Sequence, residues 1–157
     1  MRISRISNHA DIKGLGGLMA GGRWHPRGHP VVYCAENPAA ALIDTVVHLQ
    51  IDDPDDIPEG YQLLGIEVPD SVSLARLDSA SLPDDWRRQT GVTQSIGKGW
   101  LAARQTAILS VHNAIVPHTF NYLINPVHPQ SAEIRIVSSV RYPFDERLFK
   151  TGRPSSG

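Results

Sequence analysis

The chain has 157 residues, of which 41% are hydrophobic and 20% charged, and its formal net charge is −1. This length and composition fit one folded domain and exclude a disordered or fibrous chain. A near-neutral charge argues against binding DNA or RNA through phosphate contacts, and a single cysteine excludes an internal disulfide. No apolar run is long enough to span a membrane, and the N-terminus lacks the apolar core of a signal peptide, so we expect a soluble cytoplasmic protein.

The first third of the chain predicts a strand, a long loop, a second strand and a helix, over residues 2–7, 8–30, 30–35 and 37–49. The loop contains six glycines, and long shaped loops within compact domains often carry function. Asn37 and Pro38 suit the N-cap and the first position of the helix. Because residues 39–49 are apolar on almost every side, we expect this helix to be buried.

The rest of the chain predicts short strands, turns and one further helix. Strands are expected over residues 61–68, 72–77, 106–111, 114–116 and 134–140, a helix over 93–104, and loops over 52–60, 82–86 and 121–129. We expect Gly97 and Gly99 to weaken the helix, and the polar residues 151–157 to form a flexible tail. The sequence therefore predicts an α+β fold, a single compact domain over residues 1–150 with a strongly bent mixed or antiparallel sheet and short helices.

A carboxylate in the middle of the apolar helix is the first candidate for chemistry. Asp44 is costly to bury unless it is paired or hydrogen-bonded, and His48, one helical turn further on, could pair with it. One interpretation is a structural contact of Asp44 with His48 or with an arginine. The other is a catalytic carboxylate at the floor of a cleft.

The segment Gly21-Gly22-Arg23-Trp24-His25 is the second candidate. Paired glycines allow a tight turn or a close approach to a ligand, and the planar fork of Arg23 suits a diphosphate or a carboxylate. Trp24 is either a core anchor or a stacking surface for a ligand. The segment matches neither the dinucleotide-binding nor the P-loop glycine pattern.

Other chemistries find little support. None of the seven histidines belongs to a His-Glu-x-x-His motif or a Cys/His cluster, so no metal site is predicted. Cys34 lies in an apolar strand and is expected in the core. Asn121 and Asn125 are expected to close turns.

Taken in order, several short motifs resemble those of the RES-domain family, the toxins of bacterial toxin–antitoxin pairs whose antitoxins are Xre-like. They are Arg2-Ile3, Gly21-Gly22-Arg23-Trp24-His25, Val31-Val32-Tyr33, Ala41-Leu42-Ile43-Asp44, Leu82-Pro83-Asp84-Asp85-Trp86, Ile96-Gly97-Lys98-Gly99-Trp100-Leu101, Val111-His112-Asn113-Ala114 and Asn121-Tyr122-Leu123-Ile124-Asn125-Pro126-Val127-His128-Pro129. The resemblance spans residues 2–149 and depends on the order and spacing of the motifs.

The resemblance implies an ADP-ribosyltransferase-like fold that breaks NAD at the nicotinamide–ribose bond without a metal. ADP-ribose is then transferred to a protein or released by hydrolysis or phosphorolysis. The family residues that carry over are Arg2 (with Arg5 as an alternative), Arg23, Tyr33, Asp44 and Asn113. Two departures stand out, because Asp44 replaces a glutamate of the family and Asn113 replaces a serine.

The resemblance also assigns roles to these residues. Asp44 would stabilise the positive charge that develops on the ribose, and Arg2 and Arg23 would neutralise the diphosphate. Tyr33 would stack against the nicotinamide or the ribose, and Asn113 would hold the amide or a phosphate. The expected catalytic residues are thus Asp44, Arg23 and Tyr33.

Trp24 and His48 complete the set of residues expected to bind NAD. The resemblance further implies an Xre-like antitoxin that fills the cleft and, in one alternative, a target protein that accepts ADP-ribose; neither nucleic acid nor membrane is an expected partner. A competing hypothesis is a catalytically impaired nucleotide- or partner-binding module, disabled by the two departures. A third, a metal hydrolase, predicts activity that chelators remove.

Overall fold

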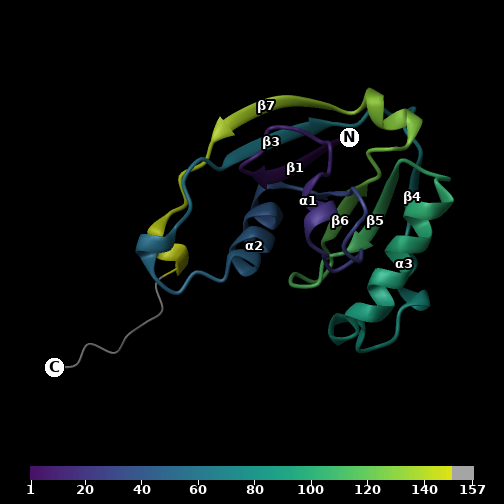
Figure 1. Ribbon diagram of the computed structural model, residues 1–157, viewed down its shortest axis with the longest axis horizontal. Helices are drawn as coiled ribbons and strands as arrows, with labels where there is room; N and C mark the ends of the chain where they lie inside the picture. The colour runs from purple at the N-terminus through teal and green to yellow at the C-terminus, as the bar shows by residue number, and fades with distance from the viewer. Residues whose placement is uncertain (150–157) are drawn as a thin grey trace.

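The computed structural model describes residues 1–149 and places all of their seven strands in one sheet. The strands are β1 (Arg2–Ser7), β2 (Val32–Ala35), β3 (Gln62–Glu67), β4 (Leu74–Arg76), β5 (Ile108–His112), β6 (Phe120–Ile124) and β7 (Arg135–Arg141). Their order is β4-β5-β6-β2-β1-β3-β7, and neighbours run antiparallel except for the parallel pair β4 and β5. The sheet bends strongly into an arch (Figure 1), which confirms the predicted α+β fold with a bent, mixed sheet.

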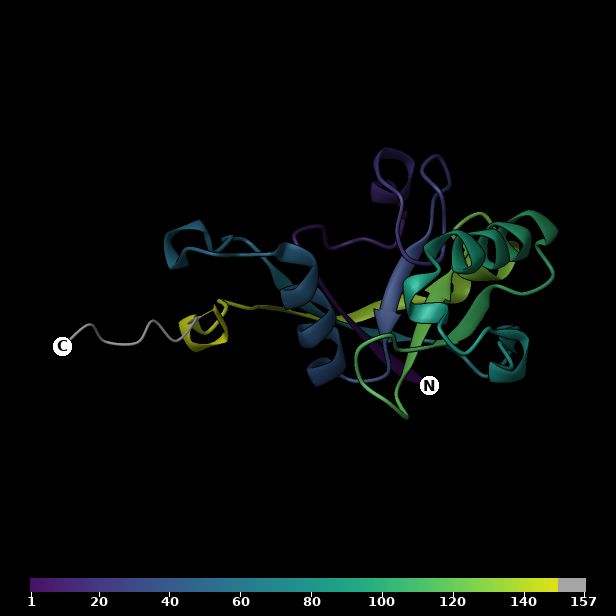
Figure 2. The ribbon, with the colours of Figure 1, turned by 90° about the horizontal axis from the view of Figure 1, so that it is seen from below.

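Helices in residues 1–149 cover parts of this sheet. The α-helices are α1 (Gly16–Met19), α2 (Pro38–Leu49) and α3 (Thr90–Ala103), and the short 3-10 helices are η1 (Pro54–Asp56), η2 (Ser79–Ser81), η3 (Trp86–Arg88), η4 (Pro129–Glu133) and η5 (Glu146–Phe149). α2 and α3 lie under opposite halves of the arch (Figure 1). Figure 2 shows that the segment containing α1 projects to one side of the sheet. The tail predicted over 151–157 lies outside the described residues.

Helix α2 begins as the sequence predicts but is less buried. The side chain of Asn37 accepts a hydrogen bond from the backbone N–H of Ala40, at 2.9 Å, and so caps the helix. Ile43 and Val47 are 39% and 54% exposed. The expectation of a helix buried on every side is therefore wrong, because α2 packs on β1 and β2 with one face only.

Two predictions near the end of the chain are also wrong. Residues 114–116 form no strand, because the side-chain oxygen of Asn113 accepts hydrogen bonds from the N–H groups of Ile115 and Val116 and closes a turn there. The loop expected over 121–129 begins instead with strand β6, which pairs with β5 and β2 on its two sides. Asn125 does close a turn, by accepting from the N–H of Val127.

The core of residues 1–149 consists of three clusters, two of which share the face of the sheet that carries the helices. One contains Trp24, Trp86 and Leu123, and the other contains Ile6, Ala40 and Ala41. Tyr33 packs against the first cluster, and Ala35, two residues further along β2, belongs to the second. Side chains at the junction of the two clusters therefore lie between α2 and the half of the molecule that contains α3.

Candidate active site

Three polar side chains meet where α2 approaches the end of the β5–β6 hairpin. The side-chain amide of Asn113 donates to both oxygens of Asp44, at 3.0 Å to Oδ1 and 3.2 Å to Oδ2. The amide of Asn121 donates to Oδ2 at 3.0 Å. The strand pairing explains the arrangement, because Asn121 faces Val111 across the hairpin and Asn113 follows Val111 by two residues on the same face of the sheet.

Asp44 is a half-buried carboxylate with opposing influences on its pKa. Burial raises the pKa of Asp44 above its usual value, while the amides of Asn113 and Asn121 and the nearby charge of Arg23 lower it. Arg23 comes from the loop before β2, so a cation from one half of the molecule lies near an acid from the other. The two charged residues are 21 positions apart in the chain.

Helix α3 fixes the loop that carries Arg23. The hydroxyl of Thr93 donates to the backbone oxygen of Arg23, at 2.5 Å, and the side-chain amide of Gln94 donates to that of Gly22, at 2.8 Å. Gly22 lies so close to the ring of Tyr33 that an added Cβ would stand 2.7 Å from the hydroxyl oxygen. A glycine is therefore required at this position by close packing.

The hydroxyl of Tyr33 is a hydrogen-bonding centre for the same loop. It accepts from the N–H of Trp24, at 3.1 Å, and lies 2.7 Å from Nδ1 of His25. The other ring nitrogen of His25 lies 3.1 Å from the carbonyl oxygen of Ala20, which can only accept, so Nε2 carries the proton and Nδ1 accepts from Tyr33. Burial raises the pKa of Tyr33 to about 12, so the hydroxyl keeps its proton at neutral pH.

The substitution Tyr33→Phe should therefore lower stability. It leaves Nδ1 of His25 and the N–H of Trp24 without partners in a buried place, which costs about 1–3 kcal/mol in the free energy of unfolding. Urea denaturation measures the loss. Tyr142→Phe is the matched control, because the hydroxyl of Tyr142 makes no hydrogen bond within residues 1–149; an equal loss in both variants would contradict this account of Tyr33.

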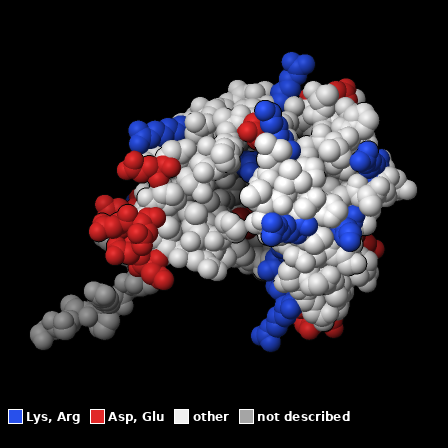
Figure 3. All heavy atoms as spheres, in the orientation of Figure 1, with Lys and Arg blue, Asp and Glu red and all other residues white. Residues whose placement is uncertain are grey.

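The side chains of Arg23 and Arg87 both lie near the ring of Trp86. The guanidinium of Arg87 lies 4.6 Å from the centre of the Trp86 ring, and its Nε donates to the backbone oxygen of Ala114 at 3.0 Å. The guanidinium of Arg23 lies 5.9 Å from the same ring and donates to the backbone oxygen of Arg87, at 3.0 Å. Figure 3 shows a hollow between the two halves of the molecule, with lysine and arginine side chains gathered on the α3 side.

The two arginines proposed from the N-terminal strand lie on different faces of the sheet. Ser4 pairs with Ala35, so Arg2 shares the face of Ala35 and Tyr33, whereas Arg5 lies on the opposite face. Arg2 is exposed, and its Nε lies 3.5 Å from Glu67. Arg5 donates to the backbone oxygen of Tyr33, at 2.9 Å, from that opposite face. Of the two, Arg2 is on the same side as Asp44.

The remaining residues expected at the site are less closely placed. Trp24 is 2% exposed and packs against Trp86, with 5.8 Å between ring centres, so the structure makes it a core residue. His48 is exposed on α2, and the partners of Asp44 are the two asparagines instead. Asn113 is 1% exposed and joins Asp44 within the protein. The structure thus joins Asp44 to Asn113 and Asn121, while the charge of Arg23 acts on the pKa of Asp44 and Tyr33 supports the loop that carries Arg23.

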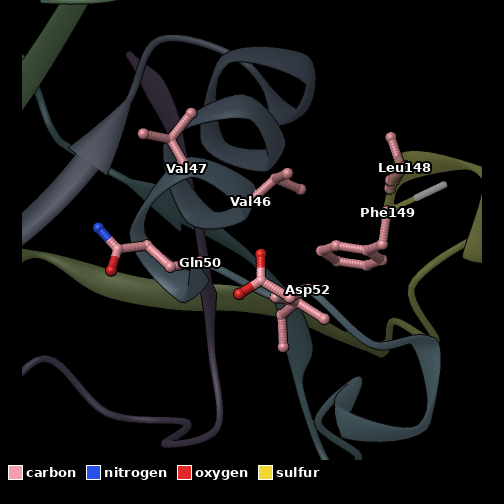
Figure 4. A pocket seen from close by; sticks show the side chains of 7 residues that line it. Val46, Val47, Gln50, Asp52, Leu148 and Phe149 are labelled. Atoms are coloured by element: carbon pink, nitrogen blue, oxygen red, sulfur yellow. The ribbon is translucent and has the colours of Figure 1, made fainter. Parts of the chain in front are cut away.

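A separate pocket of about 280 Å³ lies at the C-terminal end of α2, between Val46, Gln50 and Phe149 (Figure 4). Asp44, Arg23 and Tyr33 do not line it. Within residues 1–149, no three His, Cys, Asp or Glu side chains are grouped so as to hold a metal ion, and no helix there is long and apolar enough to cross a membrane.

Sequence reasoning missed the part that Asn121 plays, because an asparagine close to a strand end was expected to close a turn. The signal was present in the eight-residue spacing between Asn113 and Asn121. A hairpin centred between them brings their side chains to one face of the sheet, where they contact each other at 3.0 Å.

Comparisons with known proteins bear on what this site does. Residues 1–145 match the RES domain. "Toxin Res" of Pseudomonas putida is 44% identical over 149 residues, which cover 95% of this chain and 100% of that protein. The "Prs ADP-ribosylating toxin" of a Sphingobium species is 37% identical over 145 residues, covering 89% of this chain and 88% of its own.

A solved structure shows the same fold at low sequence identity. A chain of the M. tuberculosis MbcT–MbcA toxin–antitoxin complex superposes with a TM-score of 0.71 at 16% identity, covering 94% of this chain and 86% of that one. The family match, the two relatives and the fold agree with the resemblance stated from the motifs. The chain belongs to the RES-domain family.

Proposed function

We propose that this protein is the toxin of a toxin–antitoxin module and that it cleaves the nicotinamide–ribose bond of NAD. ADP-ribose then passes to a target protein, or to water or phosphate. The observation that carries this proposal is the half-buried Asp44 carboxylate, which is oriented by two amides and whose pKa is lowered by the charge of Arg23. A relative named as an ADP-ribosylating toxin supports the same chemistry.

The charge of the substrate explains the carboxylate. When the bond between ribose C1′ and the pyridinium nitrogen breaks, its electron pair leaves with nicotinamide, which departs neutral, and positive charge develops on the ribose. An acid fixed beside the ribose stabilises that charge without reorganising. An acceptor oxygen then bonds to C1′ and loses its proton. We assign to Asp44, as the charged carboxylate, the stabilisation of the ribose cation.

We assign the Arg23 guanidinium to the diphosphate, which lies in the middle of the substrate. The diphosphate of NAD carries about two negative charges at neutral pH, and a guanidinium matches the geometry of its oxygens. Arg23 is held in place by α3 through its backbone and by Arg87 through its side chain, so little freedom is lost when it binds. Arg2 lies on the same face of the sheet and can add a second cation on release from Glu67.

The direct test is incubation of the purified protein with NAD, followed by mass spectrometry of the products. The proposal predicts nicotinamide in amounts equal to the NAD consumed. Water as acceptor gives ADP-ribose, phosphate gives ADP-ribose 1″-phosphate, and a cell lysate reveals any modified protein. Unchanged NAD in all three conditions would contradict the proposal.

Activity should also depend on pH through Asp44. Only the charged carboxylate stabilises the ribose cation, and burial raises the pKa of Asp44 above its usual value of 3.8. As the pH falls through that raised pKa, the carboxylate takes up a proton and kcat/KM should fall. The acid limb should therefore lie above pH 3.8, measured while circular dichroism confirms that the protein stays folded; a rate independent of pH down to 3.8 would contradict the role of Asp44.

An antitoxin partner is the second part of the proposal. A cell that makes an NAD-consuming protein needs an inhibitor of it, and the solved relative of the same fold comes from a toxin–antitoxin complex. We infer an Xre-like antitoxin that covers the hollow between the two halves of the molecule. Expression of this chain alone should arrest growth, and co-expression of the protein encoded by the neighbouring gene should restore it.

A further inference from the structure

We propose that Asn121 is a positioning residue for Asp44: its side-chain amide and that of Asn113 fix the carboxylate so that one oxygen, Oδ1, is left to contact the substrate. This inference rests on the proposed function for its substrate. The orientation itself is a property of the protein alone and can be tested without NAD.

Asn113 has no hydrogen-bonding capacity left for a ligand. An amide side chain offers two N–H hydrogens and two oxygen lone pairs. One hydrogen of Asn113 goes to Asp44 and the other to the side-chain oxygen of Asn121, while its own oxygen accepts from two backbone N–H groups, both at 2.8 Å. Asn113 therefore binds only other groups of the protein, and a contact with Asp44 replaces the contact with NAD that was expected of it.

The same network determines which way Asn121 points. Because the side-chain oxygen of Asn121 accepts from Asn113 at 3.0 Å, its amide nitrogen must face Oδ2 of Asp44. The three side chains thus form a closed ring of hydrogen bonds. Asn121 holds Asp44 directly, and Asn113 holds both of the other members.

Counting acceptors identifies the free oxygen. A carboxylate accepts about four hydrogen bonds, two on each oxygen. The one Asn113 hydrogen that reaches Asp44 is shared between Oδ1, at 3.0 Å, and Oδ2, at 3.2 Å, and Oδ2 also receives the bond from Asn121, so Oδ1 is the less engaged oxygen. The remaining acceptor position is therefore on Oδ1.

The amides also favour the charged form of the acid. Donation from Asn113 and Asn121 lowers the pKa of Asp44, against the effect of burial. Arg23 also lowers this pKa, and His48, exposed one turn further along α2, is the titratable group next to Asp44 on its own helix. Loss of the Asn121 donor should remove one of the influences that lower the pKa of Asp44. The effect of burial then raises this pKa further, so Asp44 should titrate at a higher pH.

The test compares Asn121→Ala with Asn125→Ala. Asn125 follows the same strand, is fully buried and donates to the backbone oxygen of Leu101, so its loss disturbs packing without touching Asp44. Carbon-13 NMR of the Asp44 carboxyl in the full chain without NAD should show a higher titration midpoint in Asn121→Ala and an unchanged one in Asn125→Ala. Equal midpoints in Asn121→Ala and the parent protein would overturn the proposal.

Kinetics supply a second measurement. With NAD, kcat of Asn121→Ala should fall about 100-fold with little change in KM, because a misplacement of ~1 Å costs about that factor. If Asn121→Ala does not fold, the isosteric Asn121→Asp replaces it in the test. This variant places a second carboxyl beside Asp44 and should raise the apparent titration midpoint of the two carboxyls above that of Asp44 in the parent protein. A parent protein that leaves NAD intact would refute the proposed function, while the NMR midpoints would still decide the role of Asn121.

Discussion

Replacing Asp44 by alanine should reduce kcat for nicotinamide release by about 100-fold to 1000-fold. This is the loss typical of removing one preorganised electrostatic group. The carboxylate is the only acid that the described residues place within hydrogen-bonding distance of Asn113 and Asn121. NAD binding should persist, because Arg23 is untouched. Discontinuous assays of nicotinamide release measure the loss of kcat, and isothermal titration calorimetry measures the retained binding of NAD.

Two further variants sharpen this prediction. Asp44→Glu keeps the charge but adds a methylene to an acid that is held by two amides, so we expect a smaller loss than in Asp44→Ala, of at most about 100-fold. Asp52→Ala removes an exposed acid that lines the pocket at the end of α2 and should leave the rate unchanged. Full activity in Asp44→Ala together with a loss in Asp52→Ala would move the chemistry to that pocket.

Gly97→Ala should be the most destabilising change in α3. A methyl group at Gly97 would overlap the backbone oxygen of Trp24, where the helix contacts the loop that carries Arg23. Neither element can move easily, because Thr93 and Gln94 bind the same loop. We expect a loss of about 3 kcal/mol or more in the free energy of unfolding, measured by urea denaturation.

Gly99→Ala is the matched control in the same helix. An added Cβ at Gly99 meets nothing within 4 Å. Alanine has the higher helix propensity, so this change should raise stability by about 0.5–1 kcal/mol. If both substitutions changed stability in the same direction and by the same amount, the close packing of α3 on the loop would not be what requires glycine at position 97.

Local signals in the sequence predicted those elements whose stability is local. The cap at Asn37 and the strand of residues 2–7 are examples, and both are confirmed. Strand β6 was missed because Asn125-Pro126 and His128-Pro129 indicate a loop over residues 121–129, whereas pairing with β5 and β2 on both sides makes the first part of this segment a strand. The exposure of Ile43 and Val47 was missed for a related reason, since hydrophobicity does not say which face has a partner.

The site was predictable only in part. The resemblance pointed to Asp44 and Arg23, and the structure brings them near each other. The bond between Asp44 and Asn121 joins residues 77 positions apart, and such contacts follow from strand register, which no local pattern encodes. Trp24 was expected among the residues that bind NAD, whereas its burial against Trp86 makes it a core residue.

The central claim is that Asp44 faces the nicotinamide ribose of NAD while Arg23 binds the diphosphate. A crystal structure of the Asp44→Ala protein with intact NAD tests it most directly, because the slowed variant preserves the substrate. We predict the ribose C1′ beside the missing carboxylate, between α2 and the Asn113 and Asn121 amides, and the diphosphate against Arg23. NAD bound instead in the pocket at the end of α2, or anywhere remote from residue 44, would contradict the account.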